Sequence, residues 1–274
     1  MAISINNDSS FLFWSFKKMN EVEKNQLNLI DGGSLPYCPE EIELLLLESK
    51  ILEGGLVQQG SNYTFIVELQ SKTFNFWGIY KPFKGERPLW DFPYGTLHYR
   101  ERCSYIISDF LGWNIVPPTV IRGGPHGEGS MQFCVHYDGE SNYYTLRDSY
   151  KERMILIACF DLLVNNRDRK PGHCFRSTDG KIWGIDHGLT FHVEPKLRSV
   201  IWDFCGHELC PKRLNDIGRL AAELEEEKTK LSEELLELLE EDEFEIFRKR
   251  VAGFIKNPKL PTVEEYLKQN NLSE

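Results

Sequence analysis

The sequence predicts an α+β fold of two lobes, and three observations lead to this prediction. Short β-rich runs and one amphipathic helix fill the first half, whereas the second half is mainly helical around a single short hairpin. The length of 274 residues suits one large domain or two lobes that share a cleft. The hydrophobic fraction of 41% is ordinary and allows a buried core. No apolar run reaches the length of a membrane span. A cleft between two lobes is the expected place for a ligand.

Composition and charge narrow the class of protein. The seven cysteines are an odd number and form no CxxC pair, and residues 1–20 do not look like a secretory signal, so we expect free thiols and a cytoplasmic location. Cys205, His207 and Cys210 match no familiar zinc spacing. Residues 223–245 contain 12 acids and 2 lysines, a net charge of −10 that equals the charge of the whole chain. We expect one acidic helix there, no nucleic-acid partner and no membrane binding.

The first lobe is predicted to cover residues 38–140, after an N-terminal extension over residues 1–37. Pro39 and the glutamates that follow it suit the first turn of a helix. The β-rich runs that come next are joined by polar turns, which predicts an antiparallel meander. In chain order, we expect a short helix at 20–29 within the extension, a helix at 38–49, strands at 55–59, 63–69 and 74–80, a helix at 97–111, and strands within 114–124 and 129–137.

The second lobe is predicted to cover residues 141–274. An apolar helix is expected at 150–163, and a polar loop follows it. The runs HCFRS and KIWGIDH flank the turn Thr178-Asp179-Gly180, a pattern typical of a β-hairpin. Leucines recurring against glutamates predict a long helix at 214–239, and a further helix is expected at 244–255.

Several residues of the first lobe suit the binding of phosphates. Lys81 ends an apolar strand, and Glu101 lies in the next helix, where it can pair with the lysine. The loop with Gly60, Ser61 and Asn62 precedes that strand and offers amides and a hydroxyl. Each residue alone has a simpler explanation, as an exposed lysine, a surface glutamate or an ordinary hairpin loop.

The second lobe places two acids close together. Asp168 and His173 lie in the loop before the predicted hairpin, and Asp186 ends its second strand, so the turn folds Asp186 back beside His173. Phosphoryl transfer needs a carboxylate that orients the acceptor, a carboxylate for a divalent metal, and cations against the transferred charge. Asp168, Asp186 and the pair Arg169 and Lys170 fit these needs. The alternative is a solvated hairpin whose acids pair with its cations.

These motifs resemble the phosphatidylinositol 3- and 4-kinase superfamily, and most closely a group of uncharacterised bacterial proteins within it. The similarity covers about residues 52–202 and includes YKPFKGERPLWDFPYGTLHYRE, DLLVNNRDRKPGH and IWGIDHGLTF. HipA-type kinases are more distant relatives. The motif DxxxxNxDR, shared with type II phosphatidylinositol 4-kinases, occurs here as Asp161, Asn166, Asp168 and Arg169.

The resemblance implies a two-lobed, protein-kinase-like fold that binds ATP with Mg²⁺ or Mn²⁺. It implies that Lys81 is the nucleotide lysine and Glu101 its partner, with Asp168 as the catalytic acid and Asp186 as the metal ligand. It places the adenine beside Gln132, Phe133, Cys134 and Ile185. His173 stands where these kinases usually have asparagine or an acid as the second metal ligand, which favours a softer ion than Mg²⁺ or a contact with phosphate.

The function expected from these residues is an ATP- and metal-dependent phosphotransferase that acts on a soluble protein hydroxyl or a small molecule. A lipid acceptor is not expected, because the sequence offers no basic patch or amphipathic membrane helix. Three alternatives remain open. They are AMP transfer on the same fold, a non-catalytic nucleotide-binding scaffold, and a metal hydrolase built on His173, Asp168 and Asp186.

Overall fold

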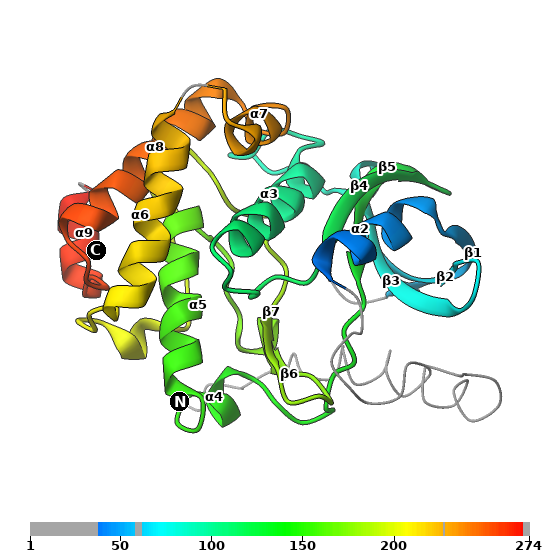
Figure 1. The fold of residues 1–274 in the computed structure, drawn as a ribbon, viewed down its shortest axis with the longest axis horizontal. Helices are drawn as coiled ribbons and strands as arrows, with labels where there is room; N and C mark the ends of the chain where they lie inside the picture. The colour runs from blue at the N-terminus through cyan, green and yellow to red at the C-terminus, as the bar shows by residue number, and fades with distance from the viewer. Residues whose placement is uncertain (1–37, 58–61, 227, 271–274) are drawn as a thin grey trace.

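The computed structural model describes residues 38–57, 62–226 and 228–270, and Figure 1 shows a sheet lobe beside a helical lobe. The sheet has five antiparallel strands in the order β1-β2-β3-β5-β4. Two helices accompany it: α2 contacts β4 and β5, and α3 contacts the same two strands. The elements of this lobe are α2 (Pro39–Glu48), β1 (Lys50–Val57), β2 (Thr64–Gln70), β3 (Asn75–Pro82), the 3-10 turn η1 (Phe83–Gly85), α3 (Leu97–Phe110), β4 (Thr119–Gly124) and β5 (Gly127–Phe133).

Strand β3 has one buried face and one face that carries Lys81 toward α3. Its residues alternate between partly buried and buried positions, as a strand with two different faces requires. Tyr80 belongs to the buried face and shares a core cluster with Ile42 and Leu46 of α2. Lys81 follows Tyr80 and therefore points to the opposite face, toward α3.

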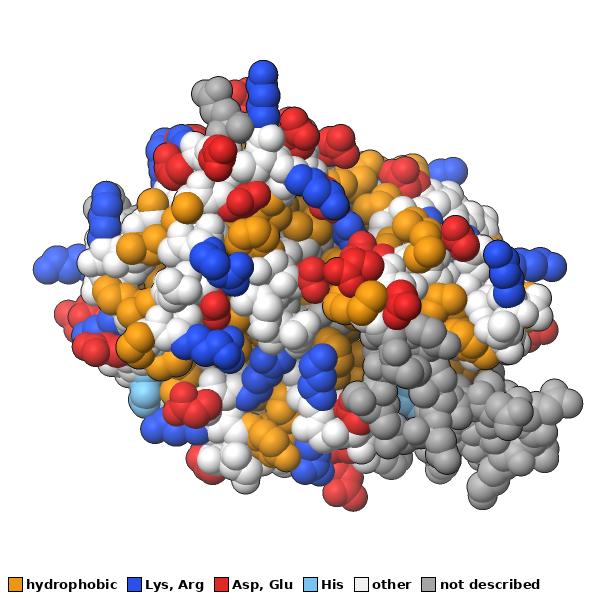
Figure 2. All heavy atoms as spheres, viewed as in Figure 1, with side chains coloured by type: hydrophobic (Ala, Val, Ile, Leu, Met, Phe, Trp, Pro, Cys, Tyr) orange, Lys and Arg blue, Asp and Glu red, His pale blue; other side chains and the backbone are white. Residues whose placement is uncertain are grey.

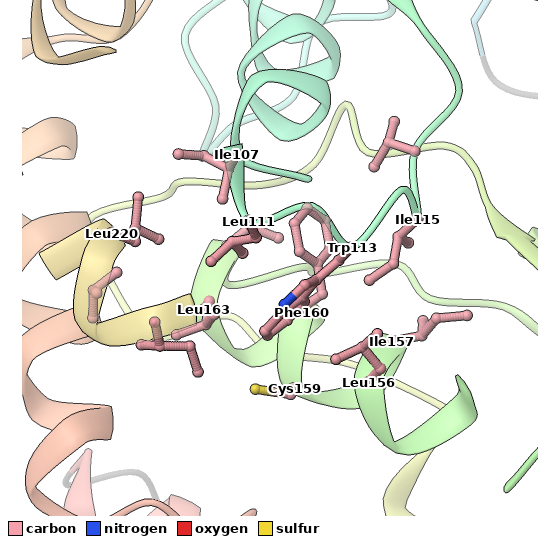
Figure 3. Close-up of a cluster of buried hydrophobic side chains, with 14 of the residues drawn as sticks. Ile107, Leu111, Trp113, Ile115, Leu156, Ile157, Cys159, Phe160, Leu163 and Leu220 are labelled. Carbon is pink, nitrogen blue, oxygen red and sulfur yellow. The ribbon is translucent and has the colours of Figure 1, made fainter. Parts of the chain in front are cut away.

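The helical lobe is built around α5, which is buried on nearly all sides. Figure 3 shows its Leu156, Phe160 and Leu163 packed with Trp113 and with Leu220 of α6. The elements of this lobe are α4 (Tyr143–Leu146), α5 (Lys151–Val164), η2 (Pro171–His173), β6 (Cys174–Arg176), β7 (Ile182–Gly184), η3 (Trp202–Phe204), α6 (Pro211–Glu225), α7 (Lys230–Leu236), α8 (Glu241–Lys256) and α9 (Val263–Gln269). Within the described ranges, no helix combines the length and the apolar character needed to cross a membrane.

Most of the predicted elements are present, with two corrections. Strand β1 begins at Lys50, earlier than the predicted start at residue 55, because an exposed edge strand with an irregular register between Ile51 and Gly54 carries no clear alternation. The predicted helix at 214–239 is wrong as a single helix. Helix α6 ends at Glu225, and α7 begins after Thr229. Thr229 is the N-cap of α7, and its hydroxyl accepts a hydrogen bond from Ser232 N at 3.1 Å.

The acidic segment is therefore not one helix, as the charge pattern predicts, but the end of α6, all of α7 and the start of α8. In Figure 2, acidic side chains gather along the upper edge of the visible face, where Figure 1 places α7. Among the described residues of this segment, the exposed acids are Glu225, Glu226, Glu233, Glu237, Glu240, Glu241 and Asp242. The extension over residues 1–37, its expected helix at 20–29, and Gly60 and Ser61 lie outside the described residues.

Candidate active site

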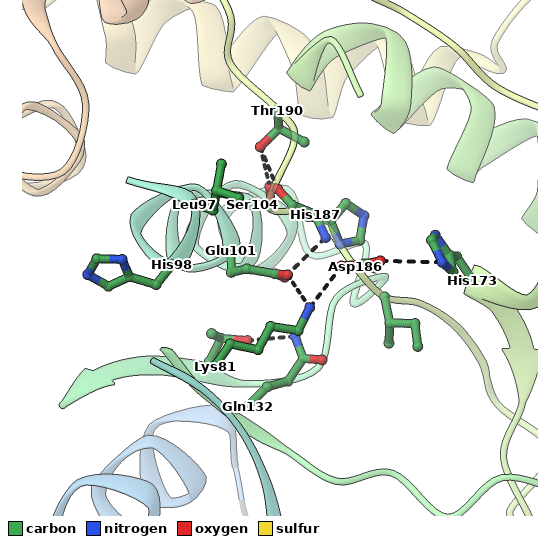
Figure 4. A network of polar contacts seen from close by, with 12 residues as sticks. Lys81, Leu97, His98, Glu101, Ser104, Gln132, His173, Asp186, His187 and Thr190 are labelled. Atoms are coloured by element: carbon green, nitrogen blue, oxygen red, sulfur yellow. Dashed lines mark hydrogen bonds and ion pairs between the residues drawn. The ribbon is translucent and has the colours of Figure 1, made fainter. Parts of the chain in front are cut away.

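Three elements bring Lys81, Glu101 and Asp186 together (Figure 4). Lys81 Nζ forms an ion pair with the Glu101 carboxylate and lies 2.9 Å from Asp186 Oδ1. The other oxygen of Glu101 accepts a hydrogen bond from the backbone N–H of His187 at 3.1 Å. Strand β3, helix α3 and the segment after β7 therefore converge on one charged cluster, as the sequence predicts for these three side chains.

The backbone of β5 lies unusually close to that of β3 beside Lys81. Gly129 is paired with Pro82, and a Cβ on this glycine would lie only 2.3 Å from the carbonyl oxygen of Lys81. A larger residue would push the two strands apart and displace the lysine, so the glycine helps to fix the position of Lys81 beside Glu101 and Asp186.

The ion pairs set the charges of this cluster. Burial opposes the positive charge of Lys81, but Asp186 and Glu101 outweigh it and hold the lysine pKa above its ordinary value. Burial likewise opposes the charge of Asp186, yet Lys81 and then His173 hold the pKa of that carboxyl well below its ordinary value. Lys81 is therefore a cation and Asp186 a carboxylate at neutral pH.

Asp186 and His173 face each other, as the hairpin predicts. Asp186 has a φ of 62°, a left-handed conformation that aspartate tolerates better than most residues and that often occurs at functional sites. His173 Nε2 lies 3.3 Å from Asp186 Oδ2, and His173 O accepts from Ile185 N at 3.0 Å. Burial lowers the pKa of His173, so its ring is neutral at pH 7, and its buried Nδ1 has no hydrogen-bond partner among the described residues.

Asp168 lies on the loop that precedes His173. Its backbone N–H donates to Asn166 Oδ1 at 2.9 Å, which fixes the turn. Its carboxylate pairs with Lys170 Nζ at 2.9 Å and with an Arg198 nitrogen at 2.7 Å. Both cations are well exposed, with 44% and 76% of their side-chain surface accessible. Such exposed pairs contribute little free energy, so an incoming molecule can replace them easily.

Arg169 is buried in the core, contrary to the expectation that it lies beside the transferred charge. Its guanidinium is fully buried and binds both oxygens of Asp161 at 2.8 Å. The remaining N–H groups reach His173 O at 3.1 Å, Ile185 O at 2.9 Å and His187 Nε2 at 2.6 Å. All five donors of the arginine are thus satisfied, and one side chain ties the loop of Asp168 to the backbone on both sides of Asp186.

The acceptor role of His187 Nε2 determines the state of that ring. An arginine nitrogen can only donate, so the ring proton must be on Nδ1. Burial, and then the charge of Arg169, lower the pKa of His187, in agreement with a neutral ring. The sequence alone assigns no role to His187 or Asp161. The structure shows that both are buried partners of the Arg169 guanidinium.

A third overlooked residue is Asp91, in the aromatic segment PLWDFP. Its carboxylate pairs with Arg167, the residue before Asp168, and lies 3.4 Å from Lys196 Nζ. The neighbouring Phe92 packs against the rings and guanidinium groups of the same region, including His192 at a centroid distance of 5.0 Å. The segment therefore joins the loop after β3 to the loop of Asp168, a contact that spans too much sequence to be read from spacing.

The residues expected around the adenine lie on and after β5. Gln132 is buried near Lys81 (Figure 4), and its amide nitrogen donates to Thr119 Oγ1 at 2.9 Å. Phe133 packs with Phe76, and Cys134 is buried. Ile185 joins an apolar cluster that also includes Val135, Tyr137, Phe175 and Trp183. Asn62 precedes β2, and its Oδ1 accepts from the backbone N–H of Arg87 at 2.8 Å.

Comparisons with known proteins agree with this architecture. The structure is similar to that of hydra Fam20 with sugar, with a TM-score of 0.56 and 14% identity over 89% of this chain and 94% of the other. It is also similar to the Golgi casein kinase with Mn/ADP bound, with a TM-score of 0.54 and 15% identity over 92% and 86% of the two chains. The fold is therefore the two-lobed, protein-kinase-like one.

Similarity of sequence gives the family. No protein-family model matches the chain. Protein Rv2133c of Mycobacterium tuberculosis is 33% identical over 252 residues, which cover 79% of this chain and 90% of that protein. The chain belongs to the family of Protein Rv2133c.

Proposed function

We propose that this chain is a kinase-type phosphotransferase that uses ATP and a divalent metal to phosphorylate a protein hydroxyl or a small molecule. The observation that carries the proposal is the convergence of Lys81, Glu101 and Asp186 in one charged cluster, with Asp168 on the loop before His173. The Golgi casein kinase, which has the same fold, binds Mn/ADP. We also propose that the chain is related to the phosphatidylinositol 3- and 4-kinases, and that the lobes meet near residue 140.

The proposed roles follow from position and charge. Lys81 binds the phosphates of ATP, and Glu101 holds it in place. Asp168 orients the hydroxyl of the acceptor and takes its proton as the acceptor oxygen attacks the γ-phosphorus and the bond to ADP breaks. Lys170 balances charge on the transferred group. Arg169 acts through its contacts with the two loops, as a positioning residue.

Asp186 and His173 are the groups that would hold the metal. The ring of His173 is neutral, and its Nε2 lies 3.3 Å from Asp186 Oδ2. With the ring proton on Nδ1, the Nε2 lone pair and the carboxylate would both be open to a metal. Within the described ranges, no cluster of three or more His, Cys, Asp or Glu side chains is arranged to hold a metal alone, so phosphate oxygens and water would complete the set. An imidazole ligand favours Mn²⁺ over Mg²⁺. The metal would neutralise charge on the phosphates.

The base of ATP is proposed to lie against the end of β5. Gln132, Phe133 and Cys134 would border it from the sheet lobe, and Ile185 from the other side. The apolar cluster that Ile185 shares with Val135 places the two lobes in contact next to this position. Asn62, with Gly60 and Ser61, is proposed to approach the phosphates.

Metal-dependent binding of ATP is the first test. ATP with Mn²⁺ is expected to raise the thermal midpoint, because a ligand at 100 times its Kd adds about 2.7 kcal/mol to the free energy of unfolding. Asp186→Ala should abolish the part of this rise that needs metal. Asp148→Ala, at an exposed position on the loop between α4 and α5, is the matched control and should behave like the wild type. No rise in the wild type with any nucleotide and metal would reject the proposal.

Removal of the lysine charge should weaken nucleotide binding itself. Lys81→Met is expected to lower the affinity for ATP and Mn²⁺ by about tenfold or more, because a hydrogen bond to a charged group contributes about 1.5–3 kcal/mol. Titration calorimetry measures the effect. Lys84→Met, which removes a lysine from the exposed turn after β3, should leave the affinity unchanged. Equal affinities for the two variants would contradict the role of Lys81.

A further inference from the structure

The acidic segment at residues 223–245 reaches helix α3, which carries Glu101. In Figure 1, α7 lies beside α3. Two carboxylates of the segment bind arginines of α3: the buried Glu243 binds Arg100, and the half-exposed Glu234 binds Arg102. The segment predicted to form one acidic helix therefore contacts α3, the helix whose Glu101 pairs with Lys81.

Arg100 anchors one flank of α3. Its side chain is 1% exposed, and it forms an ion pair with Glu243 in the first turn of α8. It also donates to Thr190 O at 2.6 Å, in the segment that follows Asp186. Ser104, one turn further along α3, lies with its hydroxyl 3.3 Å from that of Thr190 (Figure 4). A buried arginine that loses its carboxylate is left with an uncompensated charge, so this contact is costly to break.

Arg102 anchors the other flank. One of its nitrogens lies 2.5 Å from Glu43 of α2 and 2.7 Å from Thr119 O of β4, both in the sheet lobe. Another nitrogen lies 2.5 Å from Glu234 of α7. A single guanidinium thus links α3 to the sheet lobe and to the acidic segment.

The geometry of α3 relates the contacts of Arg100 and Arg102 to the position of Glu101. Successive residues of an α-helix are rotated by about 100°, so Arg100 and Arg102 project on either side of Glu101. Rotation of α3 that withdraws Glu101 from Lys81 must break the contacts on one flank or both. We propose that Glu234 and Glu243 are positioning residues, which hold α3 in the orientation that presents Glu101 to Lys81. The consequence for catalysis rests on the proposed function, whereas the effect on α3 does not.

Amide hydrogen exchange of α3 in the full chain, without nucleotide, tests the structural part. Glu234→Gln removes one charge from a half-exposed position and is expected to accelerate exchange over Leu97–Phe110 by about tenfold, because local opening governs exchange. Glu237→Gln makes the same change at an exposed position of the same acidic segment and should leave α3 unaffected. Glu243→Gln should accelerate exchange further. Should that variant not fold, Glu234→Gln still decides the question.

A double variant separates the ion pair from general loosening. Arg102→Met and Glu234→Gln should each accelerate exchange in α3, and the two changes together should act no more strongly than Arg102→Met alone, because residues that share one interaction are not additive. Unchanged exchange in Glu234→Gln, or fully additive effects in the double variant, would overturn the proposal.

Nucleotide binding then distinguishes failure of this inference from failure of the proposed function. With ATP and Mn²⁺, Glu234→Gln is expected to bind about fivefold more weakly than Glu237→Gln, since part of the binding free energy is used to reorder α3. Equal affinities for the two variants would overturn the inference while the proposed function stands. A wild type that binds no nucleotide would reject the proposed function, and the exchange of α3 alone would then decide on the positioning role.

Discussion

Asp168→Ala is expected to remove turnover while ATP still binds. General acid–base catalysis contributes about 10²–10⁴-fold to the rate, so ADP release from ATP and Mn²⁺ should fall by about that factor. The groups proposed to bind the nucleotide, Lys81 and Asp186, do not contact Asp168 through any of its ion pairs, which go to Lys170 and Arg198. The affinity for ATP, measured by calorimetry, should therefore stay close to that of the wild type.

The split between turnover and binding makes this prediction specific. Loss of both in Asp168→Ala would indicate that the carboxylate maintains the loop, as its ion pairs with Lys170 and Arg198 would allow. Retention of both would remove Asp168 from the mechanism. Asp148→Ala serves again as the exposed control. The mass of any modified product distinguishes a kinase, which adds phosphate, from an AMP transferase, which adds AMP.

Local patterns were sufficient for much of the fold and for the centre of the candidate site. Lys81 was predicted from its place at the end of an alternating strand, and Glu101 from the helix that follows. The pairing of the His173 loop with Asp186 was predicted from a hairpin turn. Each of these depends on contacts between neighbouring elements, where periodicity and turn chemistry carry the information.

Direction and distance explain what could not be predicted. Arg169 is next to Asp168 in sequence, but it forms a parallel bridge with Ser199, and in such an extended backbone successive side chains point to opposite sides. The Asp168 side chain therefore points toward Lys170 and Arg198, whereas the Arg169 side chain points into the core. Contacts such as that of Asp91 with Arg167 or Glu243 with Arg100 join distant parts of the chain, and nothing in a single sequence marks their partners.

The buried pair of Asp161 and Arg169 gives the largest expected effect on stability. Both side chains are fully buried, and Asp161 also accepts from the Asn166 amide at 2.9 Å. Asp161→Asn would leave the guanidinium charged and unpaired in the core, which is expected to cost about 3–5 kcal/mol of the free energy of unfolding. Denaturant unfolding measures this loss. Glu225→Gln, which breaks an exposed pair with Arg248, should cost less than about 1 kcal/mol.

Removal of both partners should restore part of the loss. In Asp161→Leu with Arg169→Met, no charge remains buried, and apolar replacement of a buried ion pair is often neutral or stabilising. Recovery should be incomplete here, because Arg169 also donates to Ile185 O and His173 O. Ile185 O would lose this donor, and His173 O would keep only its bond from Ile185 N. The double variant should thus be more stable than Asp161→Asn but still lose metal-dependent ATP binding, because the backbone on both sides of Asp186 is no longer held. A double variant that binds ATP as the wild type does would show that Asp186 keeps its position without the arginine.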